Sequence, residues 1–353
     1  MTRTPEKALA RFTFRDTFRV LVLAGIAVAA EGSPGTAELL RQGDYAAAAA
    51  RFAERAAEGD RVAQNNLGVL HQRGQGVAED PALALQWFER AAAQGLPGAM
   101  YNIGMLHLRG YGRPVDPAAA AGWFEKAAAL GEPEAQFYLG MLHYRGEGVV
   151  QNHATAAAWF EKAAAQDVEE ARYNLALMLA RGEGVPPDDT RALELLTPFA
   201  AEREDAALLV GEIHLRHVDD PAHAAQAHAV FKRLAESGVA DAQVAVAMLY
   251  VTGTGTPADP QEGRFWMEQA ARQGSARAQF NLGNFHAEGV GTARDPGEAW
   301  AWYSLSADGG EPAGSEFAAA LAKQMETQDL LRAASRLGEL RAKLGGHQAP
   351  GGQ

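Results

Sequence analysis

Apolar and polar residues along the chain follow a pattern with a period of 36 residues. Adjacent aromatic residues recur at this step, at Trp87-Phe88, Trp123-Phe124 and Trp159-Phe160. The register continues, with a slip of one residue, at Leu195-Leu196, Val230-Phe231, Trp266 and Trp302-Tyr303. A fixed period of this length is the signature of a repeat array.

Each period carries the signals of two helices joined by a glycine turn. The first helix begins near a small residue such as Ala63, and apolar residues four and seven positions later form one stripe. Two glycines follow, as at Gly74 and Gly76, because glycine adopts the positive φ that ends a helix. The second helix then starts behind a capping side chain, followed in four repeats by proline. The predicted caps are Asp80, Asp116, Asn152, Asp188, Asp259 and Asp295.

One helix pair cannot bury its apolar face alone, so consecutive pairs must stack. The sequence therefore predicts an all-α fold, an α-solenoid of helix-turn-helix repeats. The predicted divisions are a leader at 1–30, an N-terminal partial or capping repeat at 36–60, seven repeats at 61–312, a C-terminal helical cap at 313–345 and a disordered tail at 346–353. Within the cap, residues 315–343 are expected to form longer helices outside the repeat register.

The fifth repeat departs most from the pattern. His217 and Asp219 stand where the turn glycines are expected, and both residue types tolerate the left-handed region better than most. Its second helix is expected to start early, at Asp220-Pro221.

The recurring residues resemble the Sel-one-like repeat family, which is related to tetratricopeptide repeats. The motifs that carry this resemblance are Asn66-Leu67-Gly68, Arg73-Gly74-Gln75-Gly76-Val77, Asp80-Pro81, Trp87-Phe88 and Ala91-Ala92, and the likeness extends over about residues 36–312. The resemblance implies a right-handed α-superhelix and a role in protein–protein interaction, often as an adaptor. Some secreted members are cysteine-rich and act on β-lactams, but this chain has no cysteine.

The first thirty residues have the layout of a secretory signal. Arg3, Lys7, Arg11, Arg15 and Arg19 precede an apolar run from Val20 to Ala30. This run suits a signal peptide cleaved near Ala29 or Ala30, and it is too short to span a bilayer, which needs about 20 residues. We therefore expect a periplasmic or secreted protein without a stable membrane span after cleavage. An amphipathic membrane anchor and a disordered lead of a cytoplasmic protein remain alternatives.

Charge and composition exclude several classes of function. The formal net charge is -12, and removing residues 1–30 would make it -15. A chain this acidic does not suit nucleic-acid binding, which depends on clustered Lys and Arg. The absence of cysteine excludes disulfides, thiolate metal sites and thiol nucleophiles.

Half of the histidines fall at one repeat position, at His71, His107, His143, His214 and His286. Stacked helices are about 8–10 Å apart, so one metal ion cannot join two of these positions. Tyr250 fills the same position, which indicates an aromatic packing site with a polar tip. A pH-sensitive packing role is the alternative.

A second group combines His214, His217, His223 and His228 with Asp219 and Asp220. These are metal-ligating residue types. However, His223 and His228 are five positions apart and do not share a helical face. We therefore predict a solvated variant turn and no metal or cofactor.

One flank of the first helices carries amides and flexible apolar side chains. Amides can bond the backbone of an extended peptide, and methionine offers an adaptable apolar surface. The predicted partner-binding residues are Asn66, Asn102, Tyr138, Asn174, Asn281, Val69, Met105, Met141, Leu177 and Met248. The competing interpretation is that these residues pack neighbouring first helices together.

No catalytic motif accompanies these features. The sequence lacks His-Glu-x-x-His, Gly-x-Ser-x-Gly and Ser-x-x-Lys, and its Gly-x-Gly turns follow helices where a dinucleotide motif needs a strand. We therefore predict a scaffold of the bacterial envelope, without enzymatic activity, that binds a protein or peptide partner on its concave face. The alternatives are an envelope enzyme or ligand-binding protein acting on cell-wall or small-molecule substrates, and a cytoplasmic adaptor.

Overall fold

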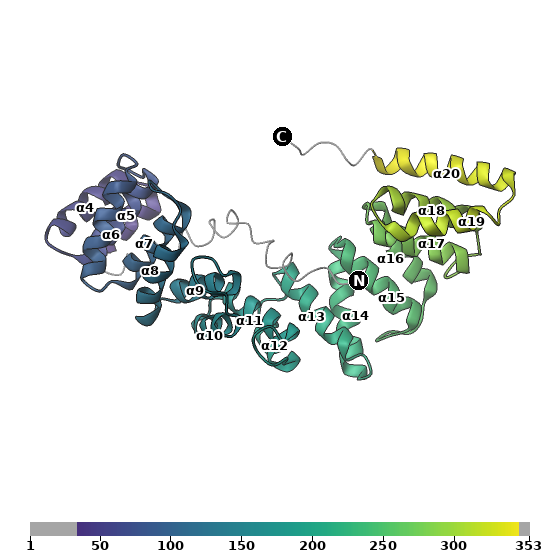
Figure 1. Ribbon diagram of the computed structural model, residues 1–353, viewed down its shortest axis with the longest axis horizontal. Helices are drawn as coiled ribbons and strands as arrows, with labels where there is room; N and C mark the ends of the chain where they lie inside the picture. The colour runs from purple at the N-terminus through teal and green to yellow at the C-terminus, as the bar shows by residue number, and fades with distance from the viewer. Residues whose placement is uncertain (1–33, 346–353) are drawn as a thin grey trace. The chain divides into compact units, whose positions relative to one another are not determined.

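A computed structural model describes residues 34–345, and the regular secondary structure in this range is helical (Figure 1). The predictions of a leader at 1–30 and a tail at 346–353 lie outside the described residues. The chain divides after Leu195 into two compact units, and each unit is described by itself.

The helices follow one another in pairs along the chain. Unit 1 contains α3 Pro34–Gln42, α4 Tyr45–Ala57, α5 Arg61–Arg73, α6 Pro81–Ala93, α7 Pro97–Arg109, α8 Pro117–Ala129, α9 Pro133–Arg145, α10 His153–Ala164 and α11 Glu169–Arg181. The short helix α12, Asp189–Leu196, reaches the division. Unit 2 contains α13 Glu204–Arg216, α14 Pro221–Glu236, α15 Ala240–Thr252, α16 Pro260–Arg272, α17 Ala276–Glu288, α18 Pro296–Asp308, α19 Pro312–Ala322 and α20 Thr327–Gly345.

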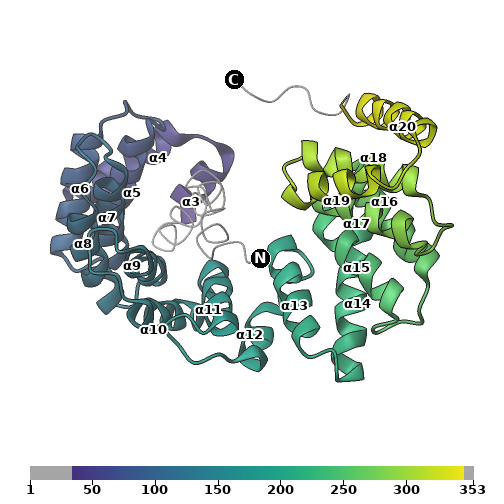
Figure 2. The same ribbon diagram turned by 45° about the vertical axis from the view of Figure 1, so that its right-hand side comes forward.

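A first helix packs against the second helix that follows it in the pairs α5–α6, α7–α8, α9–α10, α13–α14, α15–α16 and α17–α18. Each of these second helices also contacts the next first helix. Within unit 1, α5, α7 and α9 lie along the inner side of a curve, and α6, α8 and α10 lie along its outer side (Figure 2). Within unit 2, α17 and α19 share one side while α16 and α18 lie on the other (Figure 2). The predicted solenoid of helix pairs is confirmed.

The predicted helix ends are confirmed by their hydrogen bonds. Asp80 caps α6 by accepting from the Leu83 amide at 2.9 Å, and the other predicted caps act alike. The Asp80 amide also donates to the carbonyl oxygen of His71 at 2.9 Å, which closes the turn. Gly74 ends α5 with φ 62°, in the left-handed region. Local chemistry thus fixes where these second helices start and where α5 stops.

The fifth repeat corrects one expectation. Helix α14 starts early at Pro221, behind a capping Asp220, as predicted. His217, however, has φ -117°, and among described residues other than glycine a positive φ occurs at Asp167. The prediction that His217 and Asp219 adopt the left-handed conformation of the missing glycines is therefore wrong. Because the second helix starts sooner, the shorter link needs no left-handed turn.

The core of most repeats is built around one aromatic ring of the second helix, and Leu196 takes this position in the fourth repeat. Phe88, Phe124 and Phe160 are fully buried at the 36-residue step. Each ring lies against a glycine of its first helix, and a β-carbon added at Gly104 would lie 2.6 Å from Cε1 of Phe124. In the sixth repeat the ring is replaced by Met267, and the facing residue is Ala247. The second helix therefore packs its ring directly on the first helix's backbone.

Glutamine pairs tie the helices together, a feature that the sequence analysis missed. Gln64 is buried, and its amide donates to the Ala56 carbonyl oxygen at 3.1 Å, in the preceding repeat. Its own carbonyl oxygen accepts from Gln94 at 2.8 Å, within the repeat. The arrangement recurs in the pairs Gln136–Gln166 and Gln243–Gln273. Each pair satisfies a polar side chain that would otherwise be costly to bury.

The C-terminal region also differs from expectation. Helix α19 begins at Pro312, 36 residues after the start of α17, so it keeps the repeat register and has 11 residues. The expectation of longer, out-of-register helices is wrong for α19. It holds for α20, which has 19 residues and packs against α18.

Candidate functional site

The predicted flank is mostly buried in unit 1. Asn66, Tyr138, Asn174, Val69, Met105 and Leu177 are buried, and Asn102 and Met141 are partly buried. Asn102 donates to the side chain of Asn65 at 2.9 Å, and Asn174 donates to the Met141 sulfur at 3.5 Å. These bonds join successive first helices, so in unit 1 this flank packs the repeats together.

The same flank is accessible in unit 2. Met248 on α15 is 41% exposed, and Asn281 on α17 is partly buried. Phe317 on α19 is 45% exposed, and it lies 36 residues after Asn281. Phe317 is not among the residues predicted from the sequence, because this region was expected to lie outside the repeat register. Counting 36 residues onward from Asn281 would have found it.

Phe317 belongs to an aromatic cluster with Phe280 and Tyr303, which we call the aromatic patch. The rings of Phe280 and Phe317 meet edge to face with centroids 5.1 Å apart, and Tyr303 lies 5.5 Å from Phe317. The patch joins two neighbouring first helices through one second helix. The exposed ring is that of Phe317, and its contacts with Phe280 and Tyr303 restrict its motion. Because the side chain is already ordered, it would lose less conformational entropy on binding a partner.

Asn284 sets the polar edge of this patch. The Tyr303 hydroxyl donates to Oδ1 of Asn284 at 2.7 Å. Burial, and then the nearby charge of Glu288, raises the pKa of Tyr303 to about 12, so the hydroxyl stays a donor at neutral pH. The bond orients the Asn284 amide, which keeps its own N–H donors. An exposed aromatic ring beside an oriented amide suits binding of a peptide.

Carboxylates and tyrosines lie close together around α7 and the start of α9. Burial, followed by the charge of Glu134 and a hydrogen bond with it, raises the pKa of Glu132 to about 7. Glu132 occupies the N-cap position of α9 without capping it through its side chain. The rings of Tyr101 and Tyr138 lie 5.9 Å apart, and burial raises the pKa of both. Tyr138 is buried, whereas Tyr101 and Glu132 are partly buried.

The histidine column lies over the glycine turns. His71 and His143 contact the carbonyl oxygens of Ala78 and Val150 at 3.3 and 3.4 Å, and His107 contacts Arg113 at 2.9 Å. Burial is the largest cause that lowers the pKa of His107 and His286. These contacts agree with a packing position that has a polar tip, and the pH-sensitive role stays a prediction.

The second histidine group is brought together only in part. Nδ1 atoms of His214 and His223 lie 2.8 Å apart, and the rings of His217 and His223 are centred 5.2 Å apart. His228 lies elsewhere, edge-on to Tyr250 at 5.0 Å. Among residues 34–345, no group of three or more His, Cys, Asp or Glu side chains is arranged to hold a metal ion. No described helix is long and apolar enough to cross a membrane.

These features define a helical-repeat scaffold, and comparison with known families gives its class. The Sel1 repeat model matches residues 61–96, 97–132, 133–168, 169–202, 240–275 and 276–311, which is more than half of the chain. The chain belongs to the Sel1 repeat family. The model does not match residues 203–239, which contain the irregular pair α13 and α14. The family is generally one of non-enzymatic scaffolds, and its architecture is typical of protein–protein interaction.

Solved structures of similar fold include the protective antigen c5321 of uropathogenic Escherichia coli, described as displaying an SLR fold. It is 23% identical, with a TM-score of 0.52, over 88% of this chain and 76% of that one. A Sel1 repeat protein from Oxalobacter formigenes is 24% identical, with a TM-score of 0.44, over 77% and 95% of the two chains. The immunity protein Pa5087 from Pseudomonas aeruginosa is 18% identical, with a TM-score of 0.34, over 68% and 82%. No curated protein matches the chain.

Proposed function

We propose that this protein is an interaction scaffold of the bacterial envelope that binds an extended peptide segment of a partner protein. The binding surface is the first-helix side of unit 2, centred on Phe317. The observation that supports it most is the 45% exposure of Phe317 beside the partly buried Phe280, on a flank that is largely buried in unit 1. Rigid aromatic side chains are frequent anchors of protein interfaces.

The neighbouring amides give this surface its specificity. Asn284 is oriented by Tyr303, and Asn281 lies one turn before it on α17. Side-chain amides can both donate to and accept from a peptide backbone, while Phe317 and Met248 supply apolar contacts. The predicted flank residues of unit 1 remain candidates for binding, but their burial favours the packing role there.

A site-specific photocrosslinker tests this surface in the native host. Placed at position 317, it should give a discrete adduct with a protein partner, and Phe317→Ala should lower copurification of that partner. Position 265 is the matched control, because Phe265 is also 45% exposed but lies on the second helix α16. Equal adducts at both positions, or none at 317, would contradict the proposed surface.

Location in the envelope rests on the layout of residues 1–30. Fractionation of the host with N-terminal sequencing of the isolated protein tests it separately. We expect a mature chain that begins near Glu31 in the periplasmic or secreted fraction. An intact N-terminus in the cytoplasmic fraction would favour the cytoplasmic adaptor.

A further inference from the structure

The start of a second helix is normally covered by the next repeat. The second glycine of each turn approaches the first residues of the preceding second helix so closely that no side chain fits between them. A β-carbon added at Gly112, for example, would lie 2.7 Å from Cβ of Pro81. The other close approaches are Gly76 to Tyr45, Gly148 to Pro117, Gly184 to His153, Gly255 to Ala224 and Gly291 to Pro260.

The last second helix, α18, lacks this cover. The positions 36 residues after Gly289 and Gly291 are Met325 and Thr327. Lys323, the C-cap of α19, has φ -66°, so the chain does not enter the left-handed glycine turn found after most other first helices. Helix α20 follows instead. Its Ala333 comes within 3.9 Å of where a β-carbon on Gly297 would stand, which is ordinary van der Waals contact.

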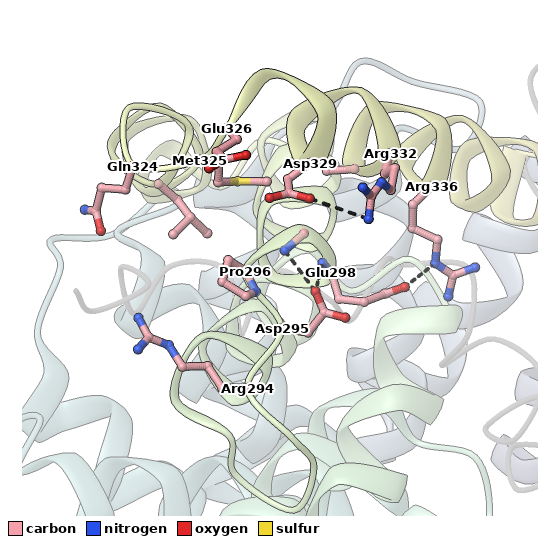
Figure 3. Close-up of a pocket in the computed structure, with 13 residues that line it drawn as sticks. Arg294, Asp295, Pro296, Glu298, Gln324, Met325, Glu326, Asp329, Arg332 and Arg336 are labelled. Carbon is pink, nitrogen blue, oxygen red and sulfur yellow. Dashed lines mark hydrogen bonds and ion pairs between the residues drawn. The ribbon is translucent and has the colours of Figure 1, made fainter.

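A cavity of about 600 Å³ lies at this place. Pro296 and Gly297 line it from the start of α18, Gln324 and Met325 from the link after α19, and Asp329 and Arg332 from α20 (Figure 3). Its volume is within the range of sites that bind small ligands or short peptide segments. The cavity therefore occupies the place that a glycine turn fills over α4, α6, α8, α10, α14 and α16.

Charges at the cavity are largely balanced within the protein. Arg336 binds Glu298 at 2.6 Å, and Arg332 lies 3.6 Å from Asp329 (Figure 3). Asp295 accepts from the Gly297 and Glu298 amides, so the N-terminus of α18 is already capped. This balance does not suit a small anion or cation. It suits a nearly neutral peptide segment whose shape decides the fit.

We propose that this cavity is a second binding site, which takes a glycine-containing turn from a partner protein. The occupant is a short loop with the Gly-x-Gly sequence, because two left-handed positions separated by one residue let a backbone approach Pro296 as the internal turns approach the preceding second helices. The site is separate from the aromatic patch and does not depend on its role.

A peptide that copies residues 145–150, with blocked ends, is the probe. Its binding to the full-length protein is compared by calorimetric titration with a peptide that has alanine for both glycines. The left-handed region costs a residue other than glycine about 1–2 kcal/mol, so the glycine peptide should bind at least about tenfold more tightly. Equal binding of the two peptides, or no binding of either, would overturn the proposal.

Variants of the protein locate the binding. Gly297→Phe should fill the cavity and abolish binding, whereas Gly338→Phe, an exposed position on α20 with open space around it, should leave binding unchanged. If Gly297→Phe does not fold, Gln324→Trp at the exposed rim replaces it. Phe317→Ala should retain peptide binding, so this test and that of the aromatic patch can fail separately.

Two other occupants of the cavity would give different results. Either result would contradict the proposal that a loop of a partner protein binds there. Peptide binding that requires removal of residues 346–353 would assign the cavity to this chain's own C-terminal segment. Dimerisation that Gly297→Phe abolishes, measured by analytical ultracentrifugation, would assign it to a second copy.

Discussion

At the scale of single residues, the helical glycines of the first helices are packing residues. Gly104 has a helical conformation that any residue could adopt, yet an added β-carbon would collide with the Phe124 ring. Alanine is the better helix former, so helix propensity and packing make opposite predictions here. The short distance, 2.6 Å, decides in favour of packing.

We expect Gly104→Ala to lower the free energy of unfolding by about 1–3 kcal/mol, the usual cost of overpacking. Gly122→Ala on the neighbouring α8 is the control, because a β-carbon there meets nothing within 4 Å. That change should stabilise the protein by about 0.5–1 kcal/mol. Urea unfolding followed by circular dichroism measures both. Stabilisation by both changes would show that the ring moves aside easily.

Glu132 should make stability depend on pH with a definite sign. Its folded-state pKa of about 7 lies above the value of 4.5 for a free glutamate, so the folded state holds a proton that the unfolded state releases between these values. The contribution of Glu132 to the free energy of unfolding therefore falls as the pH rises from 4.5 to about 7, and above that pH it stays at its lowest value. Glu132→Gln should raise the melting temperature at pH 8 and change it little at pH 4.5. The same shift at both values would contradict the linkage.

These residues also show what the sequence could and could not predict. The caps at Asp80 and Asp116 and the turn at Gly74 were predictable because capping and positive φ depend on a few adjacent residues. The burial of Asn66 and the exposure of Phe317 were not, because they depend on how closely stacked helices approach. The glutamine pairs were missed for the same reason, since their members are 30 residues apart.

At the scale of helices, the glutamine pairs couple the two helices of a repeat. Gln64 and Gln94 satisfy each other, while the next repeat has Met100 and Leu130 at the same positions. An apolar pair and an amide pair therefore both occur in this fold. A mixed pair that keeps Gln64 would leave its buried amide without one of its partners, which costs about 1–3 kcal/mol.

A double-mutant cycle tests this coupling. Gln64→Met and Gln94→Leu should each destabilise the protein, and the double variant should be more stable than the sum predicts by about 0.5–3 kcal/mol. Gln64→Met combined with Gln166→Leu is the control, because Gln166 bonds to Gln136. Those two effects should add. An additive Gln64–Gln94 cycle would show that the pair contributes no coupling.

At the scale of the whole molecule, stability should be local. In a stacked array each repeat contacts its neighbours, so damage to one repeat spreads over a few helices. We expect Gly140→Ala, which places a β-carbon 2.7 Å from the Phe160 ring, to speed amide exchange in α9, α10 and adjacent helices. Exchange in α17 and α18 should not change. Gly283→Ala should give the reverse result.

Hydrogen exchange followed by mass spectrometry of peptide fragments measures this pattern. The control is Gly122→Ala, which should speed exchange in neither unit. An equal increase in both units after Gly140→Ala would mean that the chain unfolds as one cooperative block.

The placement of these contacts along the chain bears on how such a gene can change. Gly104 and Phe124 belong to one 36-residue period, as do Gln64 and Gln94, whereas Gln64 reaches the preceding repeat through a backbone carbonyl that any residue supplies. Recombination at a period boundary would keep matched side chains together and could add or remove a whole repeat. A crossover inside the glycine turn would separate Gly104 from the Phe124 ring. It could then place an alanine such as Ala247 against an aromatic ring, or a glycine against Met267.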